Sequence, residues 1–289
     1  MSPAVGSSAM DVLVEPAAMR AWAFARRAAG QRVGIVPTMG ALHAGHRALI
    51  AEARQRVDVV IVSIFVNPLQ FDRAADFERY PRSIDDDLAT CRAAGVDAVY
   101  VPTAAAMYPP QFDTRVVPGE LANGLEGPRR PGHFEGVTTV VAKLFGATIP
   151  DVAVFGQKDY QQLAIVRRMV ADLDMGIDVI GVPTIREHDG LARSSRNSRL
   201  SVADRAAAVV IPDALSAAVE VYDRGERDAG VLRAAATKHL AGEPRADTEY
   251  VEIVDAGSLE PLDTIEAPAV ILMAVWFGDV RLIDNRLLG

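Results

Sequence analysis

The chain has little cysteine, no long apolar run and a shortage of basic residues. Cys91 is the single cysteine among 289 residues, which excludes an internal disulfide and a cysteine-based zinc site. We interpret it as a small apolar residue on a helix and expect a reducing compartment, the cytoplasm. No uninterrupted apolar stretch reaches the roughly 18 residues of a membrane-spanning helix, so we expect no membrane span. With 38 acidic against 30 basic residues the formal net charge is −8, which disfavours general binding of nucleic acid.

Several familiar signatures are also missing. Residues 1–10 lack a basic segment followed by an apolar one, so they do not resemble a secretory signal, and we expect a frayed tail. The sequence contains neither the Gly-Lys-Ser/Thr of a P-loop nor the G-x-G-x-x-G of a dinucleotide-binding turn. An anionic ligand must therefore be held by some other local cluster of donors.

What is present is a regular alternation of strand-like and helix-like segments. Short runs rich in β-branched residues predict strands at 32–37, 58–65, 98–101, 152–155 and 177–182. Helices are predicted between them at 46–56, 83–94, 136–148 and 161–173. This alternation predicts an α/β fold, a Rossmann-like parallel sheet with right-handed crossovers and helices on both faces. In such sheets ligands bind beyond the carboxyl ends of the strands.

The pattern changes near residues 184–188. Helices are predicted at 203–222 and 229–241, followed by extended runs at 248–255, 269–275 and 280–283. Helices followed by neighbouring short strands indicate a smaller α+β domain with an antiparallel sheet. We therefore expect one domain over residues 1–186 that binds the ligands and a smaller C-terminal domain over residues 187–289.

The segment between the first strand and its helix, PTMGALHAGH at 37–46, carries the strongest chemical signal. Its glycines allow close backbone approach, and free N–H groups at a helix start point toward an anion, so a phosphate fits there. His43 and His46 are three residues apart, so both imidazoles can face one ligand and donate to charge developing on a phosphoryl group. Two other readings stay open: histidines hydrogen-bonded inside a core, and a metal site, which lacks a closely spaced third ligand.

A second polar cluster, FGQKDYQQ at 155–162, follows a predicted inner strand. Lys158 can reach a phosphate as a mobile point charge, and Gln162 can donate or accept toward a small polar substrate. Taken alone, Lys158 also fits a solvated loop lysine. Its position at a strand end favours a binding role.

Two more clusters complete the set. The stretch RSSRN at 193–197 carries two guanidiniums and two hydroxyls, as a phosphate clamp or an exposed basic loop would. Asn67, Gln70 and Tyr80 follow the second strand and offer neutral hydrogen-bonding groups. All four clusters fall at predicted strand ends or at the domain junction, which indicates one ligand site.

The segments PTMGALHAGH, IFVNPLQF, FGQKDYQQ and SSRN, in this order and spacing, closely resemble those of the pantoate–β-alanine ligase (pantothenate synthetase) family. The resemblance runs from about Arg32 to the C-terminus. HAGH is similar to the HIGH signature of the nucleotidyltransferase superfamily, and residues 193–196 occupy the place of its KMSKS-like loop. Four linked motifs are far more specific than any one of them.

The resemblance implies a ligase that activates pantoate with ATP as pantoyl adenylate, releases pyrophosphate, and then passes the acyl group to β-alanine with release of AMP. The product is pantothenate, on the route to coenzyme A. The resemblance also implies Mg²⁺ beside the triphosphate, with ligands that the sequence does not identify, and a homodimer. The C-terminal domain would act as a lid that protects the adenylate from water.

The resemblance also assigns roles to residues. The expected catalytic residues are His46 as proton donor, His43 at the phosphates, and Lys158. The expected ATP-binding residues are Met39, Gly40, Ala41, Leu42, His43, Ala44, Gly45, His46, Gly156, Gln157, Lys158, Asp159, Ile185, Arg193, Ser194, Ser195 and Arg196. The expected binding residues for pantoate and β-alanine are Gln70, Gln162, Asn67, Tyr80, Pro37 and Thr38.

Two positions depart from the family pattern, and two rival functions remain. Arg193 stands where an apolar residue, commonly Met, is expected, and Gln157 replaces a frequent Glu; neither change removes a donor that the mechanism requires. An adenylyltransferase acting on a phosphorylated acceptor would call for more basic residues in the fourth cluster. A catalytically silent nucleotide-binding module is disfavoured by the intact histidine pair and lysine.

Overall fold

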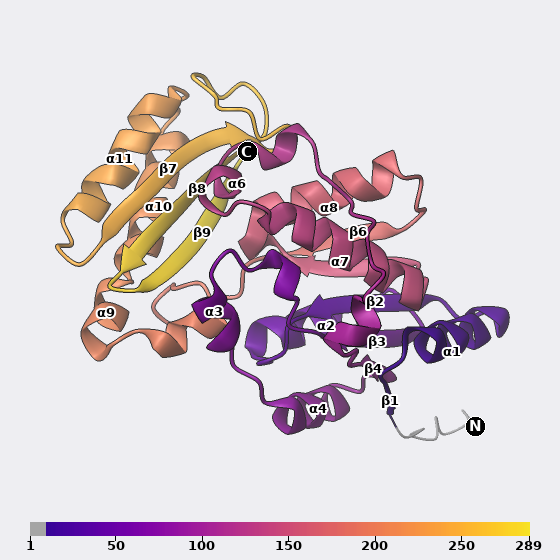
Figure 1. Cartoon of the computed structure of the whole chain (residues 1–289). Helices are drawn as coiled ribbons and strands as arrows, with labels where there is room; N and C mark the ends of the chain where they lie inside the picture. Colours follow the sequence, from indigo (N-terminus) through magenta and orange to yellow (C-terminus); the bar gives the residue numbers. More distant parts are fainter. Residues whose placement is uncertain (1–9) are drawn as a thin grey trace, which may run out of the picture. The chain divides into compact units, whose positions relative to one another are not determined.

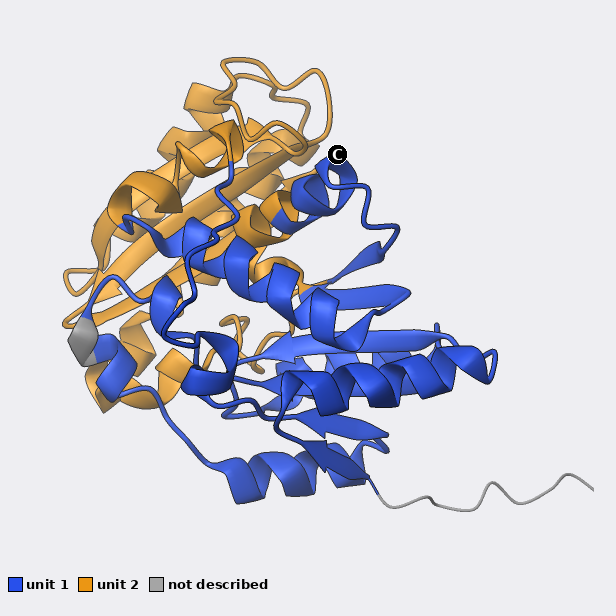
Figure 2. Ribbon diagram, turned by 45° about the vertical axis from the view of Figure 1, so that its right-hand side comes forward, with its two compact units in different colours: residues 1–118, 130–155, 166–182 blue, residues 119–129, 156–165, 183–289 orange. Residues whose placement is uncertain are grey.

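A computed structural model describes residues 10–289 (Figure 1). The chain folds into two compact units: unit 1 comprises residues 1–118, 130–155 and 166–182, and unit 2 comprises residues 119–129, 156–165 and 183–289 (Figure 2). The predicted tail lies outside the described residues except for Met10. Among residues 10–289, none of the helices combines the length and apolar character that crossing a bilayer demands.

Unit 1 is built on a six-stranded sheet in the order β1-β4-β3-β2-β5-β6. The strands are Asp11–Leu13 (β1), Val33–Thr38 (β2), Val59–Ile64 (β3), Ala98–Tyr100 (β4), Val152–Gly156 (β5) and Asp178–Val182 (β6). The pairs from β1 to β5 are parallel. β3 is buried at every residue, which explains why all its side chains except that of Ser63 are apolar.

The strand order reverses at β2. The chain passes from β2 to β3 and β4 on one side, and then returns to place β5 on the other side of β2. A reversal of this kind opens a crevice at the carboxyl ends of the two strands that flank it. PTMGALHAGH includes the end of β2, so the topology places it at the switch point of the sheet, and Phe155, the last residue of unit 1 before FGQKDYQQ continues into unit 2, lies near the end of β5.

Helices cover both faces of this sheet. On one face, α2 (Ala44–Arg54) and α4 (Ile84–Ala93) contribute Ile50, Ala53 and Cys91 to a core with β2, β3 and β4. On the other face, α1 (Pro16–Ala28) and α7 (His133–Thr148) contact each other and β2. Unit 1 also contains the short helices α3 (Ala74–Glu78), η1 (Pro68–Gln70) and α5 (Ala104–Met107). The predicted Rossmann-like α/β class is confirmed.

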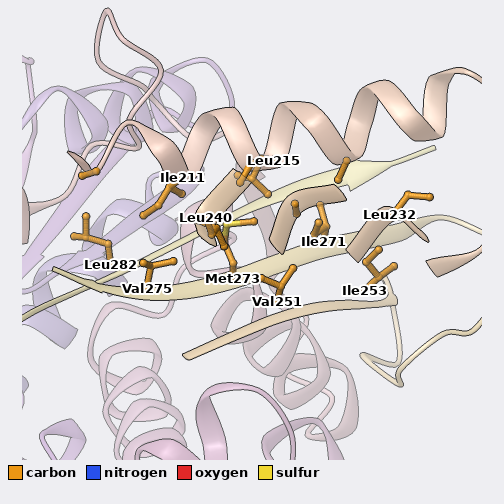
Figure 3. Packing of buried hydrophobic residues seen from close by; sticks show 14 of the residues in the cluster. Ile211, Leu215, Leu232, Leu240, Val251, Ile253, Ile271, Met273, Val275 and Leu282 are labelled. Atoms are coloured by element: carbon orange, nitrogen blue, oxygen red, sulfur yellow. The ribbon is translucent and has the colours of Figure 1, made fainter. Parts of the chain in front are cut away.

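Unit 2 contains a three-stranded antiparallel sheet in the order β7-β8-β9, with strands Asp247–Asp255, Ala269–Phe277 and Val280–Leu288. Helices α10 (Val210–Asp223) and α11 (Ala229–Ala241) pack Ile211, Leu215, Leu232 and Leu240 against one face of it (Figure 3). Truncating one such fully buried side chain to Ala typically costs about 2–5 kcal/mol. The predicted C-terminal α+β architecture is confirmed.

The opposite face of this small sheet is covered by chain from much earlier in the sequence. Leu125 and Tyr160 pack with Tyr250, Val254 and Leu272 in a second core cluster. They come from the segments that carry η2 (Glu120–Ala122), α6 (Glu126–Arg129), η3 (Gln157–Asp159) and the start of α8 (Tyr160–Asp172). These contacts make unit 2 discontinuous in sequence. The expected division into domains 1–186 and 187–289 assumes two continuous segments, and it stays a prediction.

A buried ion cluster fastens the earlier segment to the sheet. Arg281 donates to both carboxylate oxygens of Glu126, at 2.6 and 2.8 Å, and also to Glu249. The Tyr250 hydroxyl donates to Glu126 at 2.7 Å. Burial opposes the charge on Arg281, but its bonds to the two carboxylates outweigh burial and raise the pKa of the guanidinium. Removing one partner of such a cluster leaves a buried charge uncompensated, which is strongly destabilising.

Some elements differ from the sequence predictions. β1 and α1 are not predicted, although Pro16 at the helix start and buried Met19 and Ala23 at i, i+4 spacing are signals of α1. The helix predicted at 203–222 is two helices, α9 (Val202–Ala207) and α10, separated at residues 208–209. Pro212 lies in the first turn of α10, where its missing N–H costs no hydrogen bond. The strand predicted at 280–283 continues to Leu288 in β9. The other predicted elements lie within three residues of their observed bounds.

Candidate active site

The turn after β2 is held in an unusual backbone conformation. Thr38 donates through Oγ1 to the carbonyl of Ser63 at 2.7 Å and accepts from the Gly40 N–H at 3.1 Å. Gly40 and Ala41 both have positive φ, 84° and 51°. Two successive left-handed residues reverse the chain sharply, and only the first of them is a glycine. Pro37 and Thr38 therefore belong to the strand end that anchors this turn.

A carboxylate from α4 clamps the same turn. Asp87 is 2% exposed, and its two oxygens accept from the N–H groups of Ala41 at 2.9 Å and Leu42 at 2.7 Å. A Cβ added at Gly40 would lie 2.8 Å from Asp87 Oδ2, so the clamp also requires a glycine. The sequence explains Asp87 only as an acidic residue in the first turn of a helix, because its partners lie more than forty positions earlier, at a separation of 46 for Ala41.

The prediction that the turn presents free backbone N–H groups to an anion needs correction. The N–H groups of Ala41 and Leu42 are taken by Asp87. The N–H of His43 donates to His46 Nδ1 at 3.2 Å, and that of Gly45 donates to His43 Nδ1 at 3.1 Å. Protein acceptors therefore satisfy four of these groups.

The histidine pair forms a reciprocal cap at the start of α2. His43 is the N-cap and His46 the third helical residue, and their ring centroids lie 4.2 Å apart. Because Nδ1 of each ring accepts a backbone N–H, the neutral ring carries its proton on Nε2. The first turn of α2 thus brings the two rings close together, and in each neutral ring Nε2 is the donor atom, of the kind that hydrogen-bonds to phosphate oxygens.

Gln70 and its neighbours form the second part of the site in unit 1. Asn67 caps η1, and its Nδ2 donates to Gln70 Oε1 and to the Gly136 carbonyl, each at 3.0 Å. Gln70 Nε2 lies 3.2 Å from the Met39 sulfur. The structure therefore brings Gln70 together with Met39 of the PTMGALHAGH segment. Tyr80 lies at the edge of the neighbouring Phe71 ring, with centroids 5.8 Å apart.

His133, which sequence reasoning left without a role, holds the backbone of Gln70. Its Nδ1 lies 2.8 Å from the Gln70 carbonyl, and Arg130 Nη1 lies 3.0 Å from its Nε2. A carbonyl accepts and a guanidinium donates, so the ring carries its proton on Nδ1. Arg130 also lies 3.7 Å from a carboxylate oxygen of Asp72. No sequence signal links His133 to Gln70, because 63 positions separate them.

In unit 2, residues Gln157–Asp159 of the FGQKDYQQ segment form η3, with Gly156 at its N-cap position. Lys158 has a largely covered side chain, 17% exposed, whose Nζ lies 3.8 Å from the carboxylate of Asp159. Asn285, on β9, donates through Nδ2 to the carbonyls of Gln157 and Lys158, each at 2.9 Å. Asn285 is therefore a further residue that fixes the position of Lys158, and its distance in sequence hides it from motif analysis.

The two adjacent glutamines at the start of α8 differ in what they do. Gln161 is buried and bonds the N–H of Glu126 and the carbonyls of Leu121 and Gly124. Gln162, the expected pantoate ligand, is half-buried. Successive helical residues point in different directions, so Gln161 holds the segment 119–129 while Gln162 is left for another role.

The RSSRN segment is shaped by short-range bonds in unit 2. The N–H of Arg193, an exposed residue, donates to the carbonyl of Ile185 at 2.9 Å. Ser194 caps η4 (Ser195–Arg199) and accepts from the N–H of Arg196 at 3.2 Å. Ser195 and Arg196 are half-buried. These bonds order a loop that presents hydroxyls and guanidiniums.

A network of charged and polar side chains holds residues 187–205 around that loop together. Asn197 donates to Glu187 at 2.9 Å, and Arg205 donates to Glu187 at 2.8 Å and contacts Asp189 at 2.8 Å. The hydrogen bond from Arg205, followed by that from Asn197, lowers the pKa of Glu187 below its ordinary value of 4.5. Within residues 10–289, no three His, Cys, Asp or Glu side chains gather as ligands of a metal ion would.

Comparison with known proteins bears on the whole chain. The family model described as pantoate-beta-alanine ligase matches residues 11–287. The chain belongs to the pantoate–β-alanine ligase family. A relative from Geotalea daltonii, named pantothenate synthetase, is 48% identical over 271 residues, which cover 94% of this chain and 96% of the relative. The resemblance read from the four motifs is confirmed.

Solved structures of family members agree. The pantothenate synthetase of Thermus thermophilus superposes with a TM-score of 0.90 at 45% identity, covering 96% of this chain and 99% of that one. The pantoate-beta-alanine ligase of Francisella tularensis, described as complexed with β-γ ATP and β-alanine, superposes with a TM-score of 0.77 at 34% identity, covering 96% and 98%. The chain is an enzyme, and the reaction of its family is the formation of pantothenate from pantoate and β-alanine.

Proposed function

We propose that the chain forms pantothenate in two steps that consume ATP. First, a carboxylate oxygen of pantoate attacks the α-phosphorus of ATP, a new O–P bond forms, and the bond from that phosphorus to the oxygen it shares with the β-phosphate breaks. This gives pantoyl adenylate and pyrophosphate. Second, the amine nitrogen of β-alanine attacks the acyl carbon, a C–N bond forms, the C–O bond to AMP breaks, and the amine loses a proton.

The proposal depends on which nitrogen of each histidine ring carries the proton. Both rings have Nδ1 occupied by a backbone N–H, so both offer Nε2–H to a ligand at the start of α2. Donors fixed in advance stabilise the charge that develops on the transferred phosphoryl group without reorganising during the step. We assign His46 as proton donor and His43 as a second donor to the phosphates.

Lys158 and the RSSRN loop are the other phosphate ligands of this proposal. Lys158, whose backbone is fixed by Asn285, supplies a positive charge. The ordered RSSRN loop supplies Arg193, Ser194, Ser195 and Arg196. The family context and the complex named for the Francisella tularensis relative support ATP as the nucleotide and β-alanine as the amine. The other ATP contacts are proposed for Met39, Gly40, Ala41, Leu42, Ala44, Gly45, Gly156, Gln157, Asp159 and Ile185.

Mg²⁺ is proposed as part of the nucleotide substrate. Magnesium keeps several waters and is commonly held through substrate phosphates and one or two carboxylates, so it does not need a preformed cage of protein ligands. Asp159, beside Lys158, is a carboxylate that could face such an ion. The metal would neutralise charge on the pyrophosphate leaving group.

Gln70 and Gln162 are the proposed ligands of pantoate, with Gln70 also near β-alanine. Both carry amides that donate and accept without adding charge, which suits a hydroxy acid that must lose its negative charge on activation. Pro37, Thr38 and Tyr80 are proposed to line the same substrate site. Asn67 has its amide committed to protein partners, so we propose that it serves pantoate through Gln70.

The test separates the two steps. Purified protein with ATP, Mg²⁺ and pantoate should exchange labelled pyrophosphate into ATP without β-alanine, and should release AMP and pantothenate in equal amounts once β-alanine is added. Omitting pantoate should abolish both signals. Exchange that needs no pantoate would indicate an adenylyltransferase with another acceptor, and no exchange with all components present would indicate a silent nucleotide-binding module.

We also propose that the protein works as a homodimer in the cytoplasm. The family resemblance supports the dimer, and the single buried cysteine fits a reducing compartment. Sedimentation velocity at micromolar protein would give the mass of one chain or of two, 30.9 kDa for the monomer.

A further inference from the structure

A chain of hydrogen bonds connects the loop after α5 to Gln70. The hydroxyl of Tyr108 lies 2.7 Å from Asn67 Oδ1, and Asn67 Nδ2 lies 3.0 Å from Gln70 Oε1. The last member, Gln70 Nε2, faces the Met39 sulfur at 3.2 Å. All four residues belong to unit 1, and motif analysis does not mark Tyr108 as part of the site.

The partners of Asn67 fix which way its amide points. The Leu69 N–H, which can only donate, lies 3.2 Å from Oδ1, and the Gly136 carbonyl, which can only accept, lies 3.0 Å from Nδ2. A flipped amide would place its NH₂ group against the Leu69 N–H and its oxygen against the Gly136 carbonyl. Each buried group left unsatisfied in this way costs about 1–3 kcal/mol. Asn67 is 1% exposed, so water cannot relieve such a mismatch.

This orientation propagates in both directions. Oδ1 carries no proton, so the Tyr108 hydroxyl must be the donor in its contact with Asn67. Nδ2 donates its second proton to Gln70, so the atom of Gln70 that faces Asn67 is the carbonyl oxygen. The NH₂ end of Gln70 is thereby turned toward Met39, whose thioether is a weak acceptor that a carboxylate or hydroxyl oxygen would outcompete.

The surroundings of Tyr108 suit a fixed donor. Its ring packs between Phe65, with centroids 6.1 Å apart, and Phe112, with centroids 4.9 Å apart. Burial raises the pKa of the Tyr108 hydroxyl above its ordinary value, so the phenol keeps its proton throughout the range in which the enzyme would work. The backbone of Gln70 is held separately by His133, so Tyr108 is needed for the side chain rather than for the fold of η1.

We infer that Tyr108 is a positioning residue for the acid substrate: its hydroxyl holds the oriented Asn67 amide in place, and Asn67 in turn keeps the Gln70 amide with its NH₂ end toward the oxygens of pantoate. The inference rests on the proposed function, in which Gln70 binds pantoate. A Gln70 amide held this way selects an anionic hydroxy acid, because a reversed amide would set its own carbonyl against the carboxylate.

The test compares two tyrosines that lose the same atom. Tyr108→Phe removes the donor to Asn67, whereas Tyr100→Phe removes a buried hydroxyl of unit 1 that contacts the Met107 sulfur at 3.7 Å. We expect Tyr108→Phe to raise the KM for pantoate about 3- to 10-fold, as the loss of one hydrogen bond implies, while the KM for ATP stays unchanged. Tyr100→Phe should leave both constants as in the wild type. An unchanged pantoate KM in Tyr108→Phe, or equal shifts in both variants, overturns the inference.

A second test converts the Asn67 donor that faces Gln70 into an acceptor. Asn67→Asp still accepts from Leu69 and Tyr108 but offers an oxygen to Gln70, so the Gln70 amide should turn over, and kcat/KM for pantoate should fall about 10- to 100-fold, as an unsatisfied buried polar group implies. In the Asn67→Asp background, Tyr108→Phe should then cause no further rise in pantoate KM. An equal rise in both backgrounds would show that Tyr108 acts elsewhere. Wild-type protein without pantoate-dependent pyrophosphate exchange would instead refute the proposed function.

Discussion

The two imidazoles of the HAGH turn are set as donors by backbone groups of the turn itself. His46 takes the N–H of His43, and His43 takes that of Gly45. A Cβ added at Gly45 would lie 2.8 Å from His43 Cε1, so the small residue between the histidines is required by the geometry of the pair. At the residue scale the motif is therefore both a helix cap and a source of hydrogen-bond donors.

Replacing His46 by Ala separates these two roles. We expect pantoate-dependent pyrophosphate exchange to fall about 10²- to 10³-fold, as when one preorganised donor is lost. The free energy of unfolding should fall by only about 1 kcal/mol, the usual cost of a lost cap. His239→Ala, an exposed position on α11, is the matched control. Near-normal exchange in His46→Ala would remove His46 from the catalytic role.

Single residues were predictable from sequence where their partners are close in the chain. The histidine pair, Lys158 and the serine–arginine loop stand out because each motif is local. Asp87, His133 and Asn285 do not, since their partners lie 46, 63 and 128 positions away, and such pairings depend on the assembled fold.

Helix α7 packs against η1, and Gly136 permits a close approach of the two backbones. A Cβ added there would lie 2.3 Å from the Leu69 carbonyl oxygen and 2.7 Å from the Gln70 nitrogen. These are backbone atoms, so no side-chain rotation can relieve the overlap. Gly146 is on the same helix, and a Cβ added there meets nothing within 4 Å.

The surroundings of the two glycines therefore predict opposite effects of a Gly→Ala substitution on the free energy of unfolding. Gly136→Ala should lower the free energy of unfolding by about 1–3 kcal/mol, typical of overpacking, and raise the KM for pantoate. Gly146→Ala should raise the free energy of unfolding by about 0.4–1 kcal/mol through helix propensity and leave KM alone. Urea denaturation and steady-state kinetics of both variants give the comparison. Equal stability in the two variants would contradict the close approach.

Helices and strands were predictable where the pattern of their residue types is long and regular. The strands β2 and β3 were predicted from runs rich in β-branched residues, a pattern that strands with both faces covered favour. β1 is three residues long and partly exposed, so its pattern is too short to distinguish from a loop. The break between α9 and α10 is hidden because Ala-rich sequence favours helix on both sides of it.

For the whole molecule, acid should weaken unit 2 through Glu187. Its folded-state pKa is lowered, so its contribution to stability is present above the unfolded-state value near 4.5 and is lost as pH falls through the lower folded-state value. The difference in free energy of unfolding between wild type and Glu187→Gln should therefore be constant from pH 7 to about 5.5 and shrink steadily below 4.5.

Urea denaturation at a series of pH values measures this difference. Glu266→Gln removes one exposed carboxylate from the same unit and corrects for the change in net charge. A Glu187→Gln difference that stays constant down to pH 3 would show that the contacts of Glu187 with Arg205 and Asn197 do not stabilise the folded state.

The ion cluster of unit 2 also sets an order of events during synthesis on the ribosome. Glu126 precedes Arg281 by 155 residues, so the segment around α6 leaves the exit tunnel long before its cationic partner exists. At about 5–20 residues per second, the synthesis of Arg281 follows that of Glu126 by on the order of ten seconds. Until then, this carboxylate and the apolar residues beside it remain open to water and to chaperones, although strands β1 to β4 have already emerged.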